Sequence, residues 1–415
     1  MRIFFNLKNI FFLVKRIYIY SLVKFVLPCF VIKTEDLVSQ SKKFGTLLQR
    51  YDSENFHVKP TGDRLADDHF RKLLGNHEVK GQFLIKMHEI FLVTRWLIPV
   101  TNDGKIILET SGTISMLLGN LRRSGDGVFP VLRFFFTLLR LKLSKFMNLN
   151  FVNTLVSYKS LFHMVPRHGF SSGNPDFSHW VFENLPQVRM YYEAIKDNKN
   201  VKILVGPKMK DWQALSLKLL GIGSNQVVED IESYCIKVDN FYLSRLPYIH
   251  TNVVQFDPDG RRWVSKMLRN SLKKELSSDK FEKNTTFSQK IAISRFYCHR
   301  RRLIDEQVYW EKLESSGFKI VFPEKLSEYR KITSCYKAKV LLAFPSGSAI
   351  ANMIYSKDAR LVEILPSTSY ISVWFLLSRE LGFSYSLILA ETKGKGRDND
   401  YKVSTEQILG VLSKV

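Results

Sequence analysis

Residues 339–366 read KVLLAFPSGSAIANMIYSKDARLVEILP. The two apolar runs at the ends, 339–344 and 359–366, have the length and composition of buried strands, and 347–356 between them reads as a short helix. A strand, a helix and a second strand joined by short connections form a right-handed crossover, which places both strands in one parallel sheet. This stretch therefore predicts an α/β fold.

The same alternation continues in the sequence before this stretch. Strands are predicted at 201–206, 226–229, 290–295 and 318–323, and helices at 178–196, 210–223, 305–317 and 328–338. The first of these helices is expected to restart at Pro186, because proline interrupts the hydrogen bonds of a helix. Residues 95–111 are predicted as a β-hairpin, because Asn102-Asp103-Gly104 separates two short apolar runs. We expect two α/β halves that meet near residues 250–260.

Charge is the most unusual bulk property of the chain. Its 415 residues carry a net charge of +23, whereas 45% hydrophobic and 24% charged residues are typical of a folded protein long enough for two domains. Nearly all of the excess lies in four segments that contain no acid: 1–33, 128–150, 261–274 and 290–302. No nucleic-acid partner is expected, because the sequence has no zinc-finger spacing, RNP-like motif or basic-zipper heptad.

Two of the basic segments, 1–33 and 128–150, are also rich in Phe and Leu. Cations interrupt them too often to leave a window of about 18 apolar residues that could span a bilayer. For 1–33 we expect contact with an anionic membrane surface, where apolar side chains enter the headgroup region and cations meet lipid phosphates. For 128–150, a buried helix with solvated charges is an equally good interpretation.

The sequence predicts neither disulfides nor a bound metal. Four cysteines have no paired spacing: Cys29, Cys235, Cys298 and Cys335. This pattern indicates neither a disulfide framework nor a zinc site, and it fits a reducing cytoplasm. The two acids of FDPDG (256–260) are interpreted as part of a surface turn, because Pro258 and Gly260 favour one.

Two strand ends in the second half carry groups suited to an anion. The strand at 290–295 ends in Arg295 and leads through a short loop to Arg300, Arg301 and Arg302. Guanidinium groups match phosphate oxygens, although an arginine-rich loop can also be simply solvated. Ser346-Gly347-Ser348 leads from the strand at 339–344 into a helix, whose first amides attract an anion. Ligands bind beyond the carboxyl ends of parallel strands, so we expect a diphosphate between the two loops.

A third candidate site is the stretch NPDFSHWVFENLPQ (174–187). His179 and Glu183 are four residues apart, so on a helix they share one face. A carboxylate can fix the tautomer of a neighbouring imidazole and raise its basicity, as in a general base. A histidine beside Trp180 is also typical of a packed core, and the local sequence leaves both interpretations open.

Together these residues resemble a known family. HWVFENLPQV (179–188) resembles the His-Trp-x-x-Glu-x-Leu-Pro signature of the family 61 glycosyltransferases. The later similar segments are ISR (293–295) with the arginine loop, Asp305-Glu306, GFKIVFPEKLS (317–327), AKVLLAFPSGSAIANMIYS (338–356) and VEILP (362–366). The hairpin VTNDGKIILETS (100–111) also resembles the family's N-terminal part, so the resemblance covers roughly residues 90–370.

The resemblance implies a GT-B-like fold, in which two Rossmann-like domains face a cleft. It implies inverting, metal-independent transfer from a nucleotide sugar, commonly a UDP-sugar, with His179 and Glu183 in the acceptor-side half. The donor-side residues that it implies are Arg295, Arg301, Ser346, Gly347 and Asn352, with Glu363 for the ribose; the local pattern adds Arg302 and Ser348. The family often has Gly-x-His-Gly at the turn into the donor helix, where this chain has Phe344-Pro345-Ser346-Gly347.

The sequence therefore predicts an inverting glycosyltransferase with a hexosyl, N-acetylhexosaminyl or pentosyl donor and no cofactor. We expect a glycan or lipid-linked acceptor, a role in surface or capsular polysaccharide synthesis, and a peripheral location at the cytoplasmic membrane face. The expected domains are a membrane-surface segment (1–33), an acceptor-side domain (34–255) and a nucleotide-sugar-binding domain (256–415). Two alternatives remain: a pyruvyl or phosphoryl transferase on the same architecture, or a non-catalytic membrane-surface binding protein descended from the family.

Overall fold

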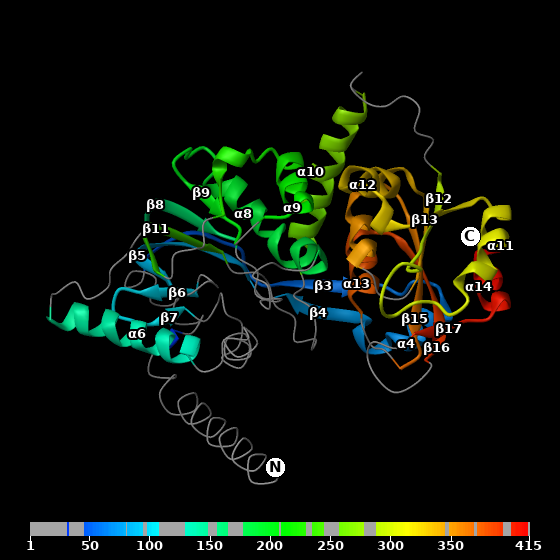
Figure 1. Cartoon of the computed structure of the whole chain (residues 1–415), viewed down its shortest axis with the longest axis horizontal. Helices are drawn as coiled ribbons and strands as arrows, with labels where there is room; N and C mark the ends of the chain where they lie inside the picture. The colour runs from blue at the N-terminus through cyan, green and yellow to red at the C-terminus, as the bar shows by residue number, and fades with distance from the viewer. Residues whose placement is uncertain are drawn as a thin grey trace, which may run out of the picture.

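The computed structural model describes residues 31–32, 45–79, 81–93, 98–107, 129–147, 156–164, 177–206, 209–229, 235–244, 257–277, 288–344, 348–368, 372–392 and 400–413. These residues form two main sheets, one from residues 31–244 and one from residues 290–402, with helices packed on both (Figure 1). The fold is therefore mixed α/β, as the sequence predicts.

The first sheet is mixed in strand direction. Its strands in the described residues are β1 (Val31–Ile32), β2 (Gly45–Arg50), β5 (Phe83–Val93), β6 (Ile98–Thr101), β7 (Ile106–Ile107), β8 (Val156–His163), β9 (Lys202–Leu204), β10 (Val227–Val228) and β11 (Cys235–Ser244). They follow the order β1-β7-β6-β5-β11-β8-β9-β10, with β2 beside β5. β11, β8, β9 and β10 run parallel, whereas β5 is antiparallel to β11, β6 and β2. The predicted strands at 201–206 and 226–229 are confirmed.

The predicted hairpin is also confirmed. β6 and β7 pair antiparallel, and the Gly104 amide donates to the Thr101 carbonyl in the turn between them at 2.9 Å. Gly104 has φ 79°, a conformation that glycine adopts without steric cost. A Cβ atom there would also lie 2.5 Å from the Leu138 carbonyl of α6 (Phe129–Met147), so glycine permits the close approach of this helix.

Helices cover both faces of the first sheet. The predicted helix that restarts at Pro186 is present as α7 (Phe177–His179), the π-helical turn η5 (Trp180–Asn184) and α8 (Gln187–Ala194), and α9 (Asp211–Leu219) and η6 (Ser224–Gln226) follow. These helices pack on the face to which Phe162 of β8 contributes, whereas α6 packs on the opposite face with Leu161. Side chains of a strand alternate between faces, so each face has its own core.

Up to residue 366 the second sheet has the predicted strand–helix alternation, and the two strands that follow were not predicted. Its strands are β12 (Lys290–Ile293), β13 (Phe318–Val321), β14 (Val340–Ala343), β15 (Arg360–Pro366), β16 (Ser384–Thr392) and β17 (Tyr401–Lys402), in the order β13-β12-β14-β15-β16-β17. All neighbours are parallel except β16 and β17. The helices are η7 (Glu306–Tyr309), α11 (Trp310–Ser315), η8 (Pro323–Lys325), α12 (Glu328–Lys337), η9 (Ser348–Tyr355), α13 (Val373–Leu381) and α14 (Thr405–Leu412). The first five strands thus follow the doubly wound order 2-1-3-4-5, in which ligands bind at the switch point between the first and third strands.

One long helix joins the two halves. α10 (Pro258–Ser277) packs against α8 and α9 of the first half and against η9 and α13 of the second. Asp257 precedes it and is buried, where its carboxylate accepts the Gly260 amide at 2.8 Å and the Gln82 side chain at 3.0 Å. The interpretation of 256–260 as a surface turn is therefore wrong, because Asp257 caps a buried helix start.

An early segment of the chain reaches the second sheet. It contains β3 (Glu54–Val58), α4 (Arg64–His69), η3 (Arg71–Leu73) and β4 (Gly75–Val79). Phe70 stacks on Phe375 of α13 with ring centroids 4.5 Å apart, and α4 packs against β16. Buried residues from both halves therefore form one continuous hydrophobic cluster.

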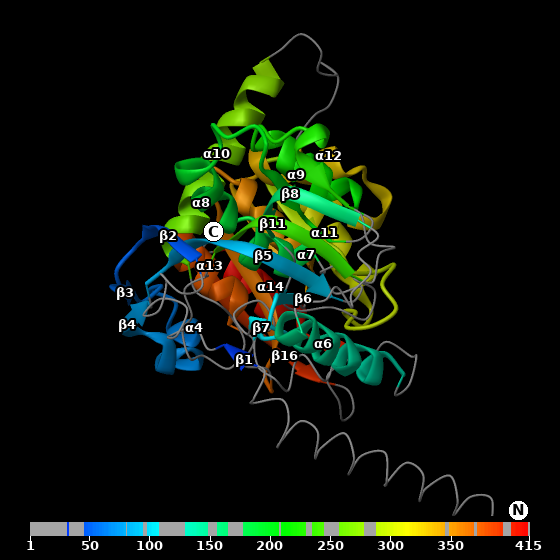
Figure 2. The ribbon, with the colours of Figure 1, turned by 90° about the vertical axis from the view of Figure 1, so that its left-hand side faces the viewer.

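Most of the predicted membrane-surface segment, 1–33, lies outside the described residues, apart from β1, which pairs in parallel with β7. The second basic segment forms α6, which lies at the outer edge of the first half, beside β6 and β7 in both views (Figures 1 and 2). Within the described part of the chain, no helix combines the length and the apolar character needed to cross a membrane.

Candidate functional site

The helix that carries the predicted pair is irregular. In η5 the Leu185 amide donates to the Trp180 carbonyl, five residues earlier, at 2.9 Å. The helix restarts at Pro186, which has no N–H to donate to the Phe182 carbonyl four residues before it. π-helical turns of this kind are frequent at functional sites.

His179 and Glu183 contact each other as their spacing predicts. Nδ1 of His179 lies 2.8 Å from Oε1 of Glu183, and the imidazole is 33% exposed whereas the carboxylate is 4% exposed. An ionised carboxylate only accepts hydrogen bonds, so Nδ1 carries the proton in this pair and Nε2 is the nitrogen that can accept one. The pair has the geometry of an imidazole oriented by a buried carboxylate, which can act as a general base.

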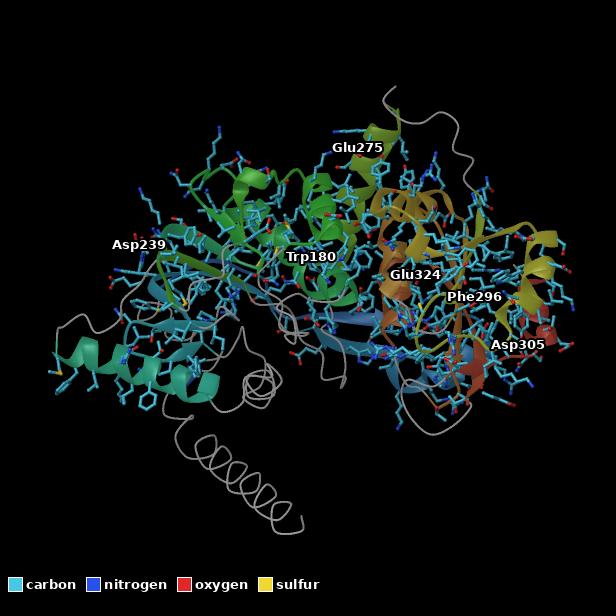
Figure 3. All side chains as sticks on the ribbon, in the orientation of Figure 1. Trp180, Asp239, Glu275, Phe296, Asp305 and Glu324 are labelled. Carbon is cyan, nitrogen blue, oxygen red and sulfur yellow. The ribbon has the colours of Figure 1, made fainter. Side chains whose placement is uncertain are left out.

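The neighbours of the pair fix it at the carboxyl edge of the first sheet. Trp180 is fully buried, and its Nε1 donates to Ser216 Oγ of α9 at 2.9 Å. Asn184 Nδ2 donates at 2.6 Å to the carbonyl of Met164, which directly follows β8. Trp180 thus anchors the helix, and Figure 3 shows it between the two halves.

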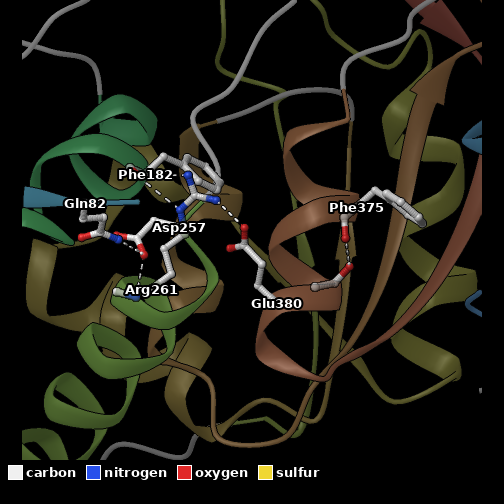
Figure 4. Close-up of polar contacts among 8 residues, drawn as sticks. Gln82, Phe182, Asp257, Arg261, Phe375 and Glu380 are labelled. Carbon is white, nitrogen blue, oxygen red and sulfur yellow. Dashed lines mark hydrogen bonds and ion pairs between the residues drawn. The ribbon is translucent and has the colours of Figure 1, made fainter. Parts of the chain in front are cut away.

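A buried arginine from α10 binds the carbonyl that Pro186 cannot satisfy. Arg261 Nε and Nη2 donate to the Phe182 carbonyl at 3.3 and 3.2 Å, and Nη1 donates to Oε1 of Glu380 on α13 at 2.6 Å (Figure 4). Both charged side chains are 0% exposed, and the guanidinium lies 4.8 Å from the centroid of the Phe182 ring. Since Phe182 directly precedes Glu183, Arg261 ties the pair to the second half of the molecule.

The arginine loop after β12 is closed by its own arginines. Arg295 Nε donates to the Arg301 carbonyl and Nη2 to the Arg300 carbonyl, both at 3.0 Å, which uses two of its five N–H donors. Arg302 donates from Nη2 to Asp400 Oδ2 at 2.7 Å, and this contact lowers the pKa of Asp400. Two of the predicted phosphate-binding arginines therefore also shape the loop.

Backbone strain is concentrated at the same loop. Arg301 and Asp305 have φ angles of 56° and 55°, in the left-handed region that disfavours residues other than glycine. Such conformations cost roughly 1–3 kcal/mol each and cluster at ligand sites. Glu306 holds the start of the loop by accepting the Arg295 amide at 3.3 Å, and burial raises the pKa of this carboxyl.

An aromatic cluster that the sequence analysis missed supports the loop. The rings of Phe296, Tyr297, Phe322 and Trp310 form a closed edge-to-face set with neighbouring centroids 5.1–5.4 Å apart. Phe322 directly follows β13 and Trp310 begins α11, so the cluster fixes the loop against both elements. The sequence signal was Phe296-Tyr297 directly after Arg295.

The turn after β14 is the second predicted part of the anion site. Ser346 and Gly347 lie outside the described residues, as does the side chain of Ser348, with which η9 begins. Asn352 is 5% exposed, and its Nδ2 donates to the Ala349 carbonyl at 3.1 Å. Asn352 is therefore bound to its own helix in this structure.

Glu363 lies inside the core of the second half. It is 0% exposed, it pairs in register with Ala343 of β14, and Tyr385 donates to its Oε2 at 2.7 Å. Within the described residues, Oε1 of Glu363 has no hydrogen-bond partner. Burial raises the pKa of Glu363 to about 8, and the bond from Tyr385 opposes this rise.

Replacing this carboxyl should reduce the pH dependence of stability. The folded pKa of Glu363 lies above the ordinary value of 4.5, so the folded state keeps a proton that the unfolded state releases. The stability associated with this group is full below pH 4.5 and is lost as the pH rises through about 8. In Glu363→Gln, the free energy of unfolding in urea should therefore fall less over this range than in the unmodified protein. Tyr385→Phe keeps the carboxyl of Glu363, so its free energy of unfolding should fall with pH at least as steeply as that of the unmodified protein. Equal pH dependence of this free energy in Glu363→Gln and in the unmodified protein would contradict the expectation.

The fold brings β12 beside β14, and α7 close to η9. Ile293 of β12 and Ala343 of β14 are register partners, so these two strands end side by side, at the switch point of the sheet. Residues of α7, which ends at His179, have Cα atoms within 8 Å of residues of η9. The His179–Glu183 pair thus lies at the junction of the halves, next to the helix that follows the Ser346 turn.

The side chains that commonly bind metal ions are His, Cys, Asp and Glu. Among the residues that the structure describes, no three His, Cys, Asp or Glu side chains are grouped so that they could hold a metal ion. Of the cysteines, Cys235 and Cys335 are buried free thiols, and burial raises the pKa of both to about 12.

The most important residue that sequence reasoning missed is Arg261. The sequence analysis counted it only as part of the basic segment 261–274, yet it shares a helix face with Val264, Leu268 and Leu272, all of which are buried. The sequence pattern that indicates its burial is its helical spacing from the apolar residues of the same face. Its partner Glu380 lies 119 residues away, and no local pattern indicates this pairing.

Part of the chain matches a known family. Residues 177–362 match the family described as Glycosyltransferase 61. The match begins at α7 and ends one residue before Glu363, so it includes both the His179–Glu183 pair and the two loops of the second sheet. A search of curated proteins finds no match. The resemblance to this family is thereby confirmed.

Proposed function

We propose that this chain, which carries a family 61 glycosyltransferase domain, transfers a sugar from a nucleotide sugar to an acceptor hydroxyl with inversion at the anomeric carbon. A glycosyltransferase uses a sugar donor and an acceptor. The proposed donor is a UDP-linked hexose, N-acetylhexosamine or pentose, and no metal or cofactor takes part. The proposed arrangement is GT-B-like, with an acceptor-side half (34–255) and a donor-side half (256–415).

One observation carries this proposal: the His179–Glu183 pair lies beside η9. The pair belongs to the carboxyl edge of the first sheet, and η9 follows the carboxyl end of β14 in the second. An in-line displacement needs a base on the acceptor side and an anion site on the donor side, separated by the length of one sugar. The carboxyl ends of parallel strands from both sheets therefore carry the two kinds of group that this reaction needs, a base and an anion site.

His179 is the proposed base. Its imidazole is the exposed member of the pair, so an acceptor hydroxyl can reach it, whereas Glu183 is almost fully buried. His179 Nε2 removes the acceptor proton as the new bond to the anomeric carbon forms. Glu183 stabilises the positive charge that then develops on the imidazole, and the nucleotide diphosphate departs from the opposite face.

The departing diphosphate carries negative charge that the second half must balance. The proposed groups are Arg295, Arg301 and Arg302 of the strained loop, together with the first amides of η9 after Ser346 and Gly347. Ser348 and Asn352 are proposed neighbours of the same turn. Glu363 lies one strand further, and its proposed role toward the ribose requires the core around it to open, because it is fully buried.

The proposed acceptor is a glycan or lipid-linked saccharide of surface polysaccharide synthesis. Residues 1–33, with six cations and no acid, are proposed to hold the enzyme at the cytoplasmic face of the membrane. A peripheral enzyme placed there can reach an acceptor whose lipid remains in the bilayer.

Thermal unfolding in the presence of nucleotides tests the donor site. Of UDP, GDP, CMP and ADP, we expect UDP to raise the melting temperature most. At about a hundred times its dissociation constant, a ligand adds roughly 2.7 kcal/mol to the free energy of unfolding, which is readily measured. Arg301→Ala should remove most of the UDP effect, because a charge-assisted bond to phosphate is lost.

A matched variant separates this loss from a general effect of charge. Arg64 on α4 has a side chain that is 97% exposed and lies outside the proposed site, so Arg64→Ala should respond to UDP like the unmodified protein. Indifference of the melting temperature to all four nucleotides would overturn the proposed function and favour a binding protein without transferase activity.

A further inference from the structure

α6 has two apolar faces, and within the described residues only one of them packs against the rest of the protein. Phe134, Leu138 and Leu141 are buried in the core of the first half. The large apolar residues exposed on the same helix are Phe136, Leu139, Leu143, Phe146 and Met147. The first four follow one another at intervals of three or four residues and Met147 adjoins Phe146, so the five form a single stripe. We call this stripe, with the exposed cations Arg140 and Lys142, the outer face of α6.

The outer face of α6 concentrates exposed apolar side chains. Ten large apolar side chains are exposed in the described residues, and half of them lie on this one helix. Phe136 is 59% exposed and Phe146 is 88% exposed. Contiguous exposed apolar patches usually mark a surface that binds a partner, because leaving them in water is unfavourable.

The charge of the helix limits the kind of partner. The 19 residues of α6 contain Arg133, Arg140, Lys142 and Lys145 and no acid. Arg140 and Lys142 are exposed next to the apolar stripe in the helical sequence. An apolar stripe accompanied only by cations complements a surface that offers acyl chains below and anionic groups above, which is the boundary of an anionic lipid bilayer.

The position of α6 allows such contact. Its inner face rests on the hairpin of β6 and β7, where Gly104 lets the helix approach closely. Both views place it at the outer edge of the first half (Figures 1 and 2). With about 1.5 Å per residue its 19 residues extend over roughly 28 Å, all of which can lie in the plane of a membrane.

We propose that the outer face of α6 docks the protein on anionic lipid bilayers, with Phe136 and Phe146 entering the headgroup boundary and Arg140 and Lys142 contacting lipid phosphates. The helix lies parallel to the surface and does not cross it. This docking is independent of the proposed transfer reaction and would hold for any donor sugar.

Co-sedimentation of the full chain with lipid vesicles tests the proposal. The chain should bind vesicles that contain phosphatidylglycerol more tightly than vesicles of phosphatidylcholine alone, and added salt should weaken the binding because it screens the charges. The double variants Phe136→Ser/Phe146→Ser and Arg140→Glu/Lys142→Glu should each weaken it roughly tenfold or more. These side chains are exposed, so the melting temperature should change little and the variants should remain folded.

A matched control has the same charge change elsewhere. Lys273 and Lys274 are exposed on α10, on which no large apolar side chain of the described residues is exposed, and Lys273→Glu/Lys274→Glu should bind vesicles nearly as well as the unmodified chain. A control variant that loses as much affinity as the α6 charge variant would overturn the proposal in favour of non-specific attraction by net charge. Binding that survives both α6 variants would assign the contact to residues 1–33. A dimer that dissociates in Phe136→Ser/Phe146→Ser, with no binding to vesicles, would instead assign the outer face to a second copy.

Discussion

Replacing Glu183 by glutamine should lower the rate of sugar transfer by about 10²–10⁴-fold, which is the usual contribution of a positioned general base. Glutamine keeps the shape of the side chain, and its oxygen can still accept a hydrogen bond from Nδ1 of His179. It cannot balance the positive charge that the imidazole gains when it takes the acceptor proton. Initial rates of nucleotide release, measured with the donor whose nucleotide stabilises the protein, provide the test.

Further variants assign the roles within the pair. His179→Ala should lose activity to a similar extent if the imidazole is the base, whereas it should keep most of the activity if Glu183 acts alone. Nucleotide-induced stabilisation should persist in both variants, because neither residue belongs to the proposed diphosphate site. Glu193→Gln makes the same chemical change at a glutamate of α8 that pairs with Arg189, and it should have unchanged rates. A rate for Glu183→Gln equal to that of Glu193→Gln would exclude the proposed role.

Replacing Arg261 by leucine should lower the free energy of unfolding by about 3–5 kcal/mol, because it leaves the buried carboxyl of Glu380 without its cation. Burial already raises the pKa of Glu380 to about 7, and Arg261 opposes this rise. Without Arg261 the folded pKa should rise further, so the deficit should be larger at high pH, where the unfolded state releases the proton and the folded state keeps it. Urea unfolding at several pH values measures both effects.

A double variant separates the charge from the backbone bond. Arg261→Leu/Glu380→Leu leaves no buried charge, so it should recover most of the lost stability. A residual deficit of about 1–3 kcal/mol is expected, because the Phe182 carbonyl has then lost its donor. Arg262 is the matched control: it lies next in the chain, its side chain is 47% exposed, and its loss should cost about 1 kcal/mol or less. Equal costs for Arg261→Leu and Arg262→Leu would contradict a structural role of the buried pair.

Local sequence patterns predicted those parts of the fold that local forces determine. The strands β12 to β15 of the second sheet are short apolar runs bounded by turns, so their positions follow from composition, whereas β16 and β17 were not predicted. The turn at Gly104 and the restart at Pro186 follow from the backbone chemistry of single residues. His179 and Glu183 meet because four residues bring side chains to one face of a helix.

Features that depend on distant partners could not be predicted in this way. β5 and β11 pair over their length although about 150 residues separate them in sequence, and nothing in either strand indicates antiparallel pairing. Asp257 was interpreted as part of a surface turn. Its carboxylate accepts hydrogen bonds from Gly260 and from Gln82, and the distant partner Gln82 could not be inferred from the local sequence. The buried role of Arg261 could not be predicted, because its carbonyl partner is left without a donor only where Pro186 interrupts a helix in the other half.

The packing of Phe70 on Phe375 has a consequence for synthesis of the protein. During translation, residues near Phe70 leave the ribosome long before the strands and helices on which they rest. At about 5–20 residues per second, roughly 15–60 s pass before Phe375 follows. Over that interval the apolar side of the early segment lacks its final cover, so we expect the nascent chain to expose an aggregation-prone surface that chaperones can bind. Completion of the native fold must therefore wait for release of the C-terminal region.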